Sequence, residues 1–168
     1  MTGDVRSVFT DTRHGDLMVR TEPGVLAARR AAIVDRPWSW LRQVHGARVI
    51  TVTEPGEHAG EEADAAVTAV PGAVLAVQTA DCAPVLLTGP GVIGVAHAGW
   101  RGLEAGVIEA TAAAMADLGG APERATLGPC IRGRCYELGT CTACSPNHWS
   151  HRARAEPQRQ ALVAWIEP

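Results

Sequence analysis

Three short apolar runs in the middle of the chain limit most strongly how it can fold. They are Ala73–Thr79 (AVLAVQT), Pro84–Thr88 (PVLLT) and Val92–Ala96 (VIGVA). Each run is bounded by Gly, Pro or Asp and is long enough only for a strand, so each predicts a buried strand. Buried strands need other elements packed around them, and the chain is therefore expected to form a layered domain.

The flanking sequence supplies those other elements. We expect further strands at Val5–Thr10, within Trp40–Thr53, at Ala125–Leu127 and at Gln160–Ile166, helices at Pro23–Asp35 and Leu103–Leu118, and a polar loop at Glu54–Glu62. Gly119–Gly120 is typical of a helix end. The predicted fold class is α/β: a single α+β layered domain over residues 1–168, with a mixed central sheet and flanking helices.

Composition excludes several kinds of function. The net charge is -3, which argues against a nucleic-acid partner or an anionic membrane partner, because both attract basic surfaces. All 15 basic residues are arginine, so the chain has no lysine to form a Schiff base. The N-terminus has no secretory signal pattern and no apolar run is long enough to span a membrane, so we expect a cytoplasmic protein.

Three metal-ligating residue types lie where predicted strands meet turns. His45 is in Gln-Val-His-Gly, Cys82 follows one buried run, and His97 ends the next. Imidazole and thiolate suit zinc, and three protein ligands leave a fourth position for water or substrate. Taken singly, a His at a strand end is more often a hydrogen-bonded structural residue, and a Cys such as Cys82 in an apolar run is usually a small core residue.

A turn after His97 points to an anion. Gly99 and Arg101 belong to a Gly-Trp-Arg-Gly segment that leads into the helix expected from Leu103. Free backbone N–H groups at a helix N-terminus favour negative charge, and arginine binds phosphate in a bidentate manner. The alternative is that Arg101 is a solvated turn residue. A metal beside a phosphate cradle predicts a reaction of a small phosphorylated molecule or one that consumes phosphate.

These motifs resemble the YfiH-type family, variously described as purine nucleoside phosphorylases, laccase-like multicopper polyphenol oxidases and peptidoglycan editing factors. The similar segments are LRQVHGARVITV, ADAAVTAVPGAVLAVQTADCAPVLL, VIGVAHAGWRGLEAGVIEAT, LGPCIRGRCYELG and HWSHRARAEPQRQALVAWI. The resemblance implies zinc bound by His45, Cys82 and His97. It also implies phosphorolysis of adenosine, inosine, guanosine or methylthioadenosine, and deamination of adenosine, with a purine nucleoside and phosphate as partners.

The resemblance extends to residues around the metal. It places Arg101, His151 and Arg152 on the pocket, and we add Gln43 and Gly99 as substrate-side or phosphate-side residues. Zinc deaminases use a Glu for proton transfer. No equivalent Glu is evident, so Asp81 joins the three ligands as a candidate catalytic residue, although an Asp that caps a turn fits the same position.

The chain departs from the family pattern after Gly139. The stretch that usually follows YELG is missing, which predicts an internal deletion at 139/140 and a fold trimmed relative to the family. The deletion brings four cysteines close in sequence: Cys130, Cys135, Cys141 and Cys144. Their spacing does not match a zinc ribbon, so we expect scattered free thiols near the surface.

Three other functions remain open. A His₂Cys set also occurs in copper sites, which add a weak axial Met, so a copper-dependent polyphenol oxidase is the first alternative. We expect neither Met18 nor Met115 to be placed as that ligand. The second alternative is a cytoplasmic editing factor for peptidoglycan precursors, and the third is an inactive, metal-binding remnant left by the deletion.

Overall fold

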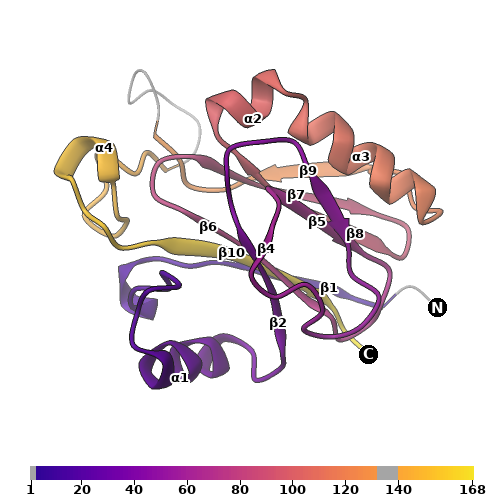
Figure 1. Cartoon of the computed structure of the whole chain (residues 1–168), viewed down its shortest axis with the longest axis horizontal. Coiled ribbons are helices and arrows are strands. Elements are labelled where there is room, and N and C mark those ends of the chain that lie inside the picture. Colours follow the sequence, from indigo (N-terminus) through magenta and orange to yellow (C-terminus); the bar gives the residue numbers. More distant parts are fainter. Residues whose placement is uncertain (1–2, 132–139) are drawn as a thin grey trace.

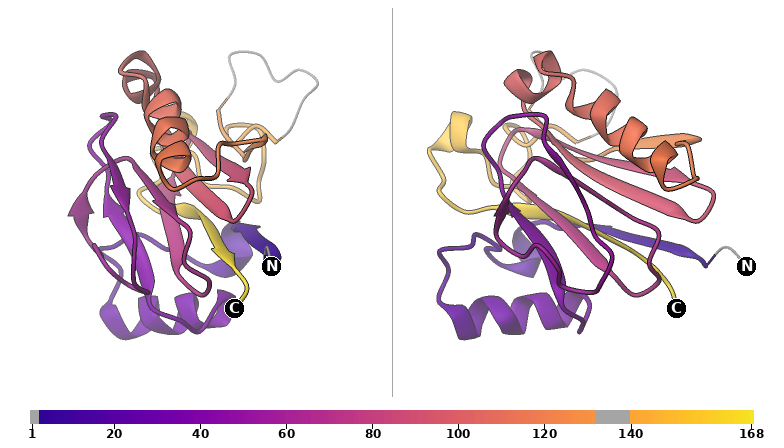
Figure 2. Two further views of the ribbon diagram at one scale, coloured as in Figure 1. Left: turned by 90° about the vertical axis from the view of Figure 1, so that its right-hand side faces the viewer. Right: turned by 45° about the vertical axis from the view of Figure 1, so that its right-hand side comes forward.

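The computed structural model describes residues 3–131 and 140–168. Its strands form two mixed five-stranded sheets that pack face to face, with helices on the outer face of each (Figures 1 and 2). The layers therefore run helix, sheet, sheet, helix. The predicted α/β class and the single domain are confirmed, and the mixed sheet expected from the sequence is divided into two.

The first sheet has the strand order β1-β10-β6-β2-β4. Its strands are β1 (Val5–Phe9), β10 (Gln160–Ile166), β6 (Val74–Thr79), β2 (Trp38–Arg42) and β4 (Glu61–Glu62). β10 is antiparallel to both neighbours, whereas β2 is parallel to β6 and β4. Helix α1 (Pro23–Ile33) covers the outer face of this sheet, and the short helix η1 (Thr12–His14) follows β1.

The second sheet has the strand order β3-β5-β8-β7-β9. Its strands are β3 (Val49–Thr51), β5 (Ala65–Thr68), β8 (Val92–Ala98), β7 (Ala83–Gly89) and β9 (Arg124–Leu127). Only β3 and β5 pair in parallel. Helices α2 (Trp100–Glu104) and α3 (Val107–Asp117) lie on its outer side, and α4 (His151–Arg154) stands apart near the start of β10 (Figure 1).

Strand β6 shows how the layers are held together. Leu75 and Val77 point into the core between the two sheets, whereas Val74 and Ala76 pack on the α1 side. All four are at most 1% exposed, because successive side chains of a strand face opposite ways and both faces are covered. This double burial explains why the run over residues 74–77 is apolar at every position rather than alternating between apolar and polar residues.

Two predicted elements are divided in the structure. The expected helix Leu103–Leu118 is wrong as one element: it is interrupted after α2 at Gly106, whose φ of 83° is left-handed. The strand pattern of Trp40–Thr53 is likewise interrupted, and the turn between β2 and β3 carries His45 at a φ of 62°. The sequence analysis also missed β5. Within the described residues, no helix is long and apolar enough to cross a membrane.

Candidate metal centre and its basic pocket

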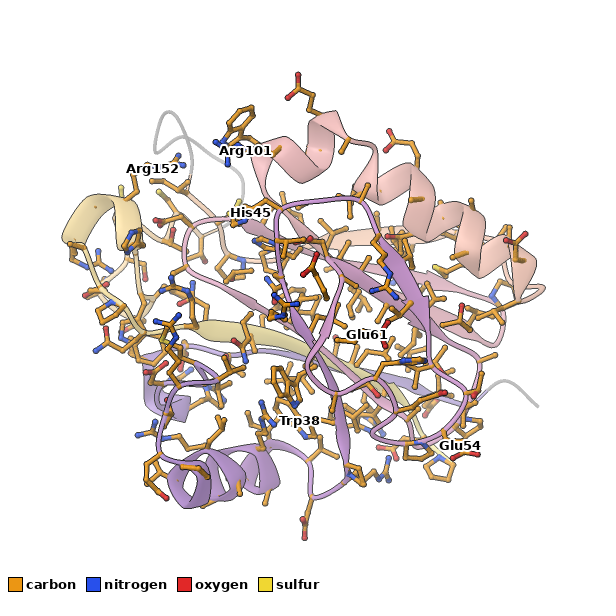
Figure 3. All side chains as sticks on the ribbon, viewed as in Figure 1. Trp38, His45, Glu54, Glu61, Arg101 and Arg152 are labelled. Atoms are coloured by element: carbon orange, nitrogen blue, oxygen red, sulfur yellow. The ribbon has the colours of Figure 1, made fainter. Side chains whose placement is uncertain are left out.

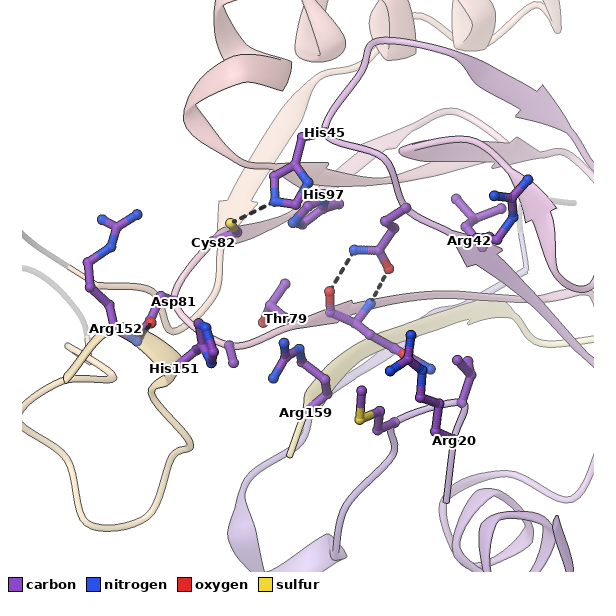
Figure 4. Close-up of a pocket in the computed structure, with 16 residues that line it drawn as sticks. Arg20, Arg42, His45, Thr79, Asp81, Cys82, His97, His151, Arg152 and Arg159 are labelled. Atoms are coloured by element: carbon purple, nitrogen blue, oxygen red, sulfur yellow. Dashed lines mark hydrogen bonds between the residues drawn. The ribbon is translucent and has the colours of Figure 1, made fainter. Parts of the chain in front are cut away.

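His45, Cys82 and His97 come together at one end of the two sheets. One ligand atom from each residue lies within 4.8 Å of the others. The Cys82 Sγ and His45 Nε2 atoms are 3.9 Å apart (Figure 4). Tetrahedral zinc with ordinary Zn–N and Zn–S lengths places its ligand atoms roughly 3.3–3.8 Å apart, so small side-chain rotations close the site. The group could therefore bind a metal.

A buried carboxylate holds two of the three side chains in position. Asp64 is fully buried and its Oδ1 atom lies 2.7 Å from His97 Nδ1. Asp64 also accepts hydrogen bonds from the backbone N–H groups of Val44, His45 and Gly46. These bonds stabilise the left-handed conformation of His45. When His97 donates from Nδ1, its Nε2 atom carries the lone pair that a metal needs.

The ionisation of this group follows from its surroundings. Burial opposes a charge on Asp64, but the hydrogen bonds from His97, Gly46 and Val44 hold its pKa below the ordinary value. Burial also opposes a charge on His97, yet Asp64 and Cys82 raise its pKa to about 9. Burial and the neighbouring His97 lower the pKa of His45. His45 is thus ready to act as a neutral ligand, and a metal must displace a proton from His97.

Gly99 has no side chain, and this leaves room for the side chains of His45 and Cys82. A Cβ atom at this position would lie 2.8 Å from His45 Cδ2 and 3.2 Å from Cys82 Sγ. Both contacts are closer than ordinary packing permits. Gly99 therefore allows α2 to begin directly against the candidate ligands.

Asp81 organises the segment around α4. It is 5% exposed and has a left-handed φ of 93°. Its carboxylate accepts hydrogen bonds from Thr142 Oγ1 at 2.8 Å, Ser150 Oγ at 2.6 Å and the Arg152 backbone N–H at 2.6 Å. With three donors on its carboxylate, Asp81 positions the His151 and Arg152 segment beside Cys82.

A pocket of about 410 Å³ opens beside the candidate ligands (Figure 4). His45, Cys82 and His97 line one end of it, and the predicted residues Gln43, Asp81, His151 and Arg152 also line it. Its described lining contains four arginines: Arg20, Arg42, Arg152 and Arg159. Asp81 is the only acidic residue of that lining, so the pocket is basic although the chain as a whole is acidic.

Gln43 has a structural role in this pocket. Its Nε2 atom donates to the Gln78 carbonyl and its Oε1 atom accepts from the Gln78 N–H, both at 2.7 Å. The Gln78 side chain in turn donates to the Leu17 carbonyl at 2.8 Å. These contacts connect β2, β6 and the segment before α1 across the pocket floor.

Arg101 lies near the candidate metal centre but outside the lining of the basic pocket. It belongs to α2, and its guanidinium stands 5.1 Å from the centre of the Trp100 ring (Figure 3). A second pocket of about 260 Å³ lies here, lined by Trp100, Leu103 and Ile131 and bordered by Cys82 and Arg152. Trp100 is 61% exposed, which is unusual for so large an apolar ring.

The sequence analysis did not select Asp64, Arg20 or Arg159. Asp64 had a signal: it is a charged residue between apolar residues that later prove to be buried. Arg20 and Arg159 had no signal, since they are 139 residues apart and lie in polar segments.

The predicted cysteine behaviour differs from the structure. Cys130 and Cys141 are 8% and 9% exposed, and their backbones form an isolated β-bridge. These two cysteines are therefore buried, whereas the sequence analysis expected them near the surface. Cys144 is disulfide-bonded, which also differs from the prediction. Cys135 and the rest of 132–139 lie outside the described residues.

Comparison with known proteins identifies the family. The sequence profile of the multi-copper polyphenol oxidoreductase laccase family matches residues 13–140. The chain belongs to this family, which is the YfiH-type family that its motifs resemble. The fold agrees: a YfiH protein of Bacillus licheniformis, described as hypothetical, superposes with a TM-score of 0.84 at 20% identity, covering 97% of this chain and 93% of that one.

Curated relatives carry the name purine nucleoside phosphorylase. One from Streptomyces coelicolor is 49% identical over 149 residues, covering 85% of this chain and 59% of that protein. The Escherichia coli protein YfiH is 49% identical over 105 residues, covering 60% of this chain and 41% of that protein. The chain thus spans less than two thirds of the length of these relatives.

Proposed function

We propose that this protein is a zinc-dependent purine nucleoside phosphorylase that also deaminates adenosine. The observation that carries the proposal is the convergence of His45, Cys82 and His97 at one end of a basic pocket. The relatives' names support the phosphorolytic half. Adenosine, inosine, guanosine and methylthioadenosine are the proposed nucleosides, and the cytoplasm is the proposed location.

The donor set fits zinc. Two imidazole nitrogens and a thiolate are ordinary zinc ligands, and a carboxylate that accepts from the far nitrogen of a ligating histidine is a usual companion of zinc sites. Asp64 provides that contact to His97. Zinc held by three protein ligands supplies a Lewis acid with one open position.

The two pockets fit the two substrates of phosphorolysis. In that reaction the bond between ribose C1′ and the purine nitrogen breaks, a phosphate oxygen bonds to C1′, and the leaving purine takes a proton. The apolar pocket beside Trp100 suits a purine ring, because aromatic faces stack on bases. The basic pocket suits phosphate. Cys82 lines both pockets, which is where the reacting carbon is expected.

Deamination uses the same centre. Water replaces the amino group of adenosine and ammonia leaves, so the products are inosine and ammonia. The hydrogen bonds of Asp81 favour a positioning role for this carboxylate over proton transfer. We therefore propose that Asp81 holds His151 and Arg152 at the pocket, and that Gln43 shapes the pocket floor.

The proposed deletion at 139/140 is compatible with this site. The matched family region ends at residue 140, and the chain spans only part of its relatives' length. His45, Cys82 and His97 all lie before that point. The deletion is expected to trim the surroundings of the pockets rather than the candidate ligands.

The test combines metal analysis with product chromatography. Purified protein is expected to hold about one zinc per chain and to convert inosine plus phosphate into hypoxanthine and ribose 1-phosphate. Adenosine should give adenine with phosphate and inosine without it. The Cys82→Ala variant should lose the metal and both activities. If this variant retained either activity, a metal-centred reaction would be refuted.

The same experiment addresses the alternatives. The family's description as a polyphenol oxidoreductase favours copper as the second candidate. Met115 is fully buried and Met18 is among the residues that line the basic pocket, and the expectation that neither serves as an axial copper ligand stays a prediction. Intense visible absorption with copper and phenol oxidation would support that candidate. Zinc without nucleoside turnover would instead support a peptidoglycan-precursor editing factor or an inactive remnant.

A further inference from the structure

The basic pocket carries positive charge that the described part of the chain does not neutralise. Arg42 is paired with Glu62 at 2.7 Å. Within residues 3–131 and 140–168, the guanidinium groups of Arg20, Arg152 and Arg159 form no ion pair with a carboxylate. Asp81, the acidic residue of the lining, is already bound by three donors. Unpaired guanidinium groups gathered in one pocket favour an anionic ligand.

Hydrogen bonds of the Arg159 backbone hold together the two segments that carry Arg20 and Arg159. The Leu17 N–H donates to the Arg159 carbonyl at 3.0 Å, and the Arg159 N–H donates to Asp16 Oδ1 at 2.9 Å. Leu17 is 1% exposed and so anchors the segment in the core. The turn closed by Thr21 N–H and the Met18 carbonyl then presents Arg20 to the pocket. Figure 4 shows both guanidinium groups facing the pocket.

The Arg159 side chain is itself braced. Its Nη1 atom donates to the carbonyls of Pro157 at 2.7 Å and Gln158 at 2.8 Å. These bonds fix one nitrogen of the guanidinium and leave others for a ligand, since arginine carries five N–H donors. In the described residues, the Arg20 side chain has no hydrogen bond. One braced arginine and one unengaged arginine form a fork that suits the oxygens of phosphate.

We propose that Arg20 and Arg159 form the phosphate subsite of this protein, with His151 and Arg152 at its edge. Arg101 does not line this pocket, so the subsite differs from the position expected from the Gly-Trp-Arg-Gly turn. Its ligand is a phosphate group, either inorganic phosphate or the phosphate ester of a nucleotide. The choice of inorganic phosphate as co-substrate rests on the proposed function.

The test measures binding and needs no turnover. Inorganic phosphate is titrated calorimetrically into the metal-loaded protein in the absence of nucleoside, and adenosine 5′-monophosphate is titrated in a separate arm with adenosine as reference. Arg20→Gln is the principal variant, because its side chain supports no other described residue. It should weaken phosphate affinity about tenfold or more, as should Arg159→Gln.

Arg124→Gln is the matched control. Arg124 is an exposed arginine on β9, outside the pocket, and its replacement should leave phosphate affinity unchanged. Thermal unfolding of each variant separates lost binding from lost structure, which matters for Arg159 because it braces its own loop. Arg101→Ala should affect phosphate affinity less than Arg20→Gln.

The outcomes separate this proposal from the proposed function. Weaker phosphate binding in Arg20→Gln together with a wild-type protein that cannot cleave inosine would support the subsite and refute the phosphorylase. An effect confined to adenosine 5′-monophosphate would support the subsite with a phosphate ester as its ligand. Wild-type affinity for both ligands in Arg20→Gln and Arg159→Gln, or no binding of either ligand by the wild type, would overturn the subsite.

Discussion

Asp64 and His97 form a buried pair, with 2.7 Å between Asp64 Oδ1 and His97 Nδ1. The two residues are 33 positions apart and lie 0% and 3% exposed. The same carboxylate also fixes the turn that carries His45. Asp64 therefore positions two of the three candidate metal ligands without contacting the metal position itself.

Replacing Asp64 with Asn is expected to weaken metal binding. The amide keeps the shape of the side chain but loses the charge that orients His97, and loss of such a contact costs about 10- to 100-fold in metal affinity. Competition with a chromophoric chelator measures the affinity. Asp117→Asn, at the end of α3, is the control. Unchanged zinc affinity in Asp64→Asn would show that Asp64 has only a structural role.

Gly99→Ala is expected to disturb the centre by steric conflict. The added methyl group would lie 2.8 Å from His45 Cδ2 and 3.2 Å from Cys82 Sγ, so these candidate ligands must shift. We expect at least a tenfold loss of metal affinity, with the fold retained. Gly24→Ala in α1 is the control, because its Cβ atom would have ordinary contacts only. Metal content after dialysis against a chelator compares the two variants.

Trp100→Ala is expected to weaken nucleoside binding selectively. Stacking of a base on an aromatic ring contributes about 1–3 kcal/mol, which corresponds to roughly 5- to 150-fold in affinity. The KM for inosine should rise by a factor in that range while the KM for phosphate stays constant. Trp100→Phe should recover much of the loss. A rise in both KM values would indicate a general disturbance of the site instead.

The low pKa of Asp11 is expected to make the free energy of unfolding depend on pH. Its carboxylate, which is 11% exposed, accepts hydrogen bonds from the Arg13 guanidinium and backbone N–H, and these lower its pKa from 3.8 to about 2. A lowered pKa stabilises the folded protein above pH 3.8, and this contribution is lost as the pH falls through 3.8 towards 2. Because Arg13 is 82% exposed, solvent screening reduces the contribution to roughly 1–2 kcal/mol.

Urea unfolding between pH 2 and pH 6 measures that contribution. Asp11→Asn should lower the free energy of unfolding at pH 6 and make it depend less on pH below 4. Asp4→Asn, close to the N-terminus, serves as the control. If Asp11→Asn and the wild type lose stability in parallel on acidification, the low pKa of Asp11 does not contribute.

The sequence by itself determined the class of fold and drew attention to His45, Cys82 and His97. Runs such as residues 74–77, in which every residue is apolar, require burial on both faces, and a His or Cys at a strand end is recognisable locally. The sequence could not show that the strands divide into two sheets, because apolar residues on the two faces of one strand look alike. A helical pattern likewise did not reveal that Gly106 interrupts the helix.

Only the tertiary structure decided what surrounds the candidate ligands. Asp64 acts through hydrogen bonds to residues 18 to 33 positions away, and the spacing of the sequence carries no record of such contacts. Arg20 and Arg159 reach the same pocket because the Arg159 backbone is hydrogen-bonded to the Asp16 carboxylate and to the Leu17 N–H. Charge in a pocket is the sum over side chains from distant segments, so it emerges only when those segments are packed together.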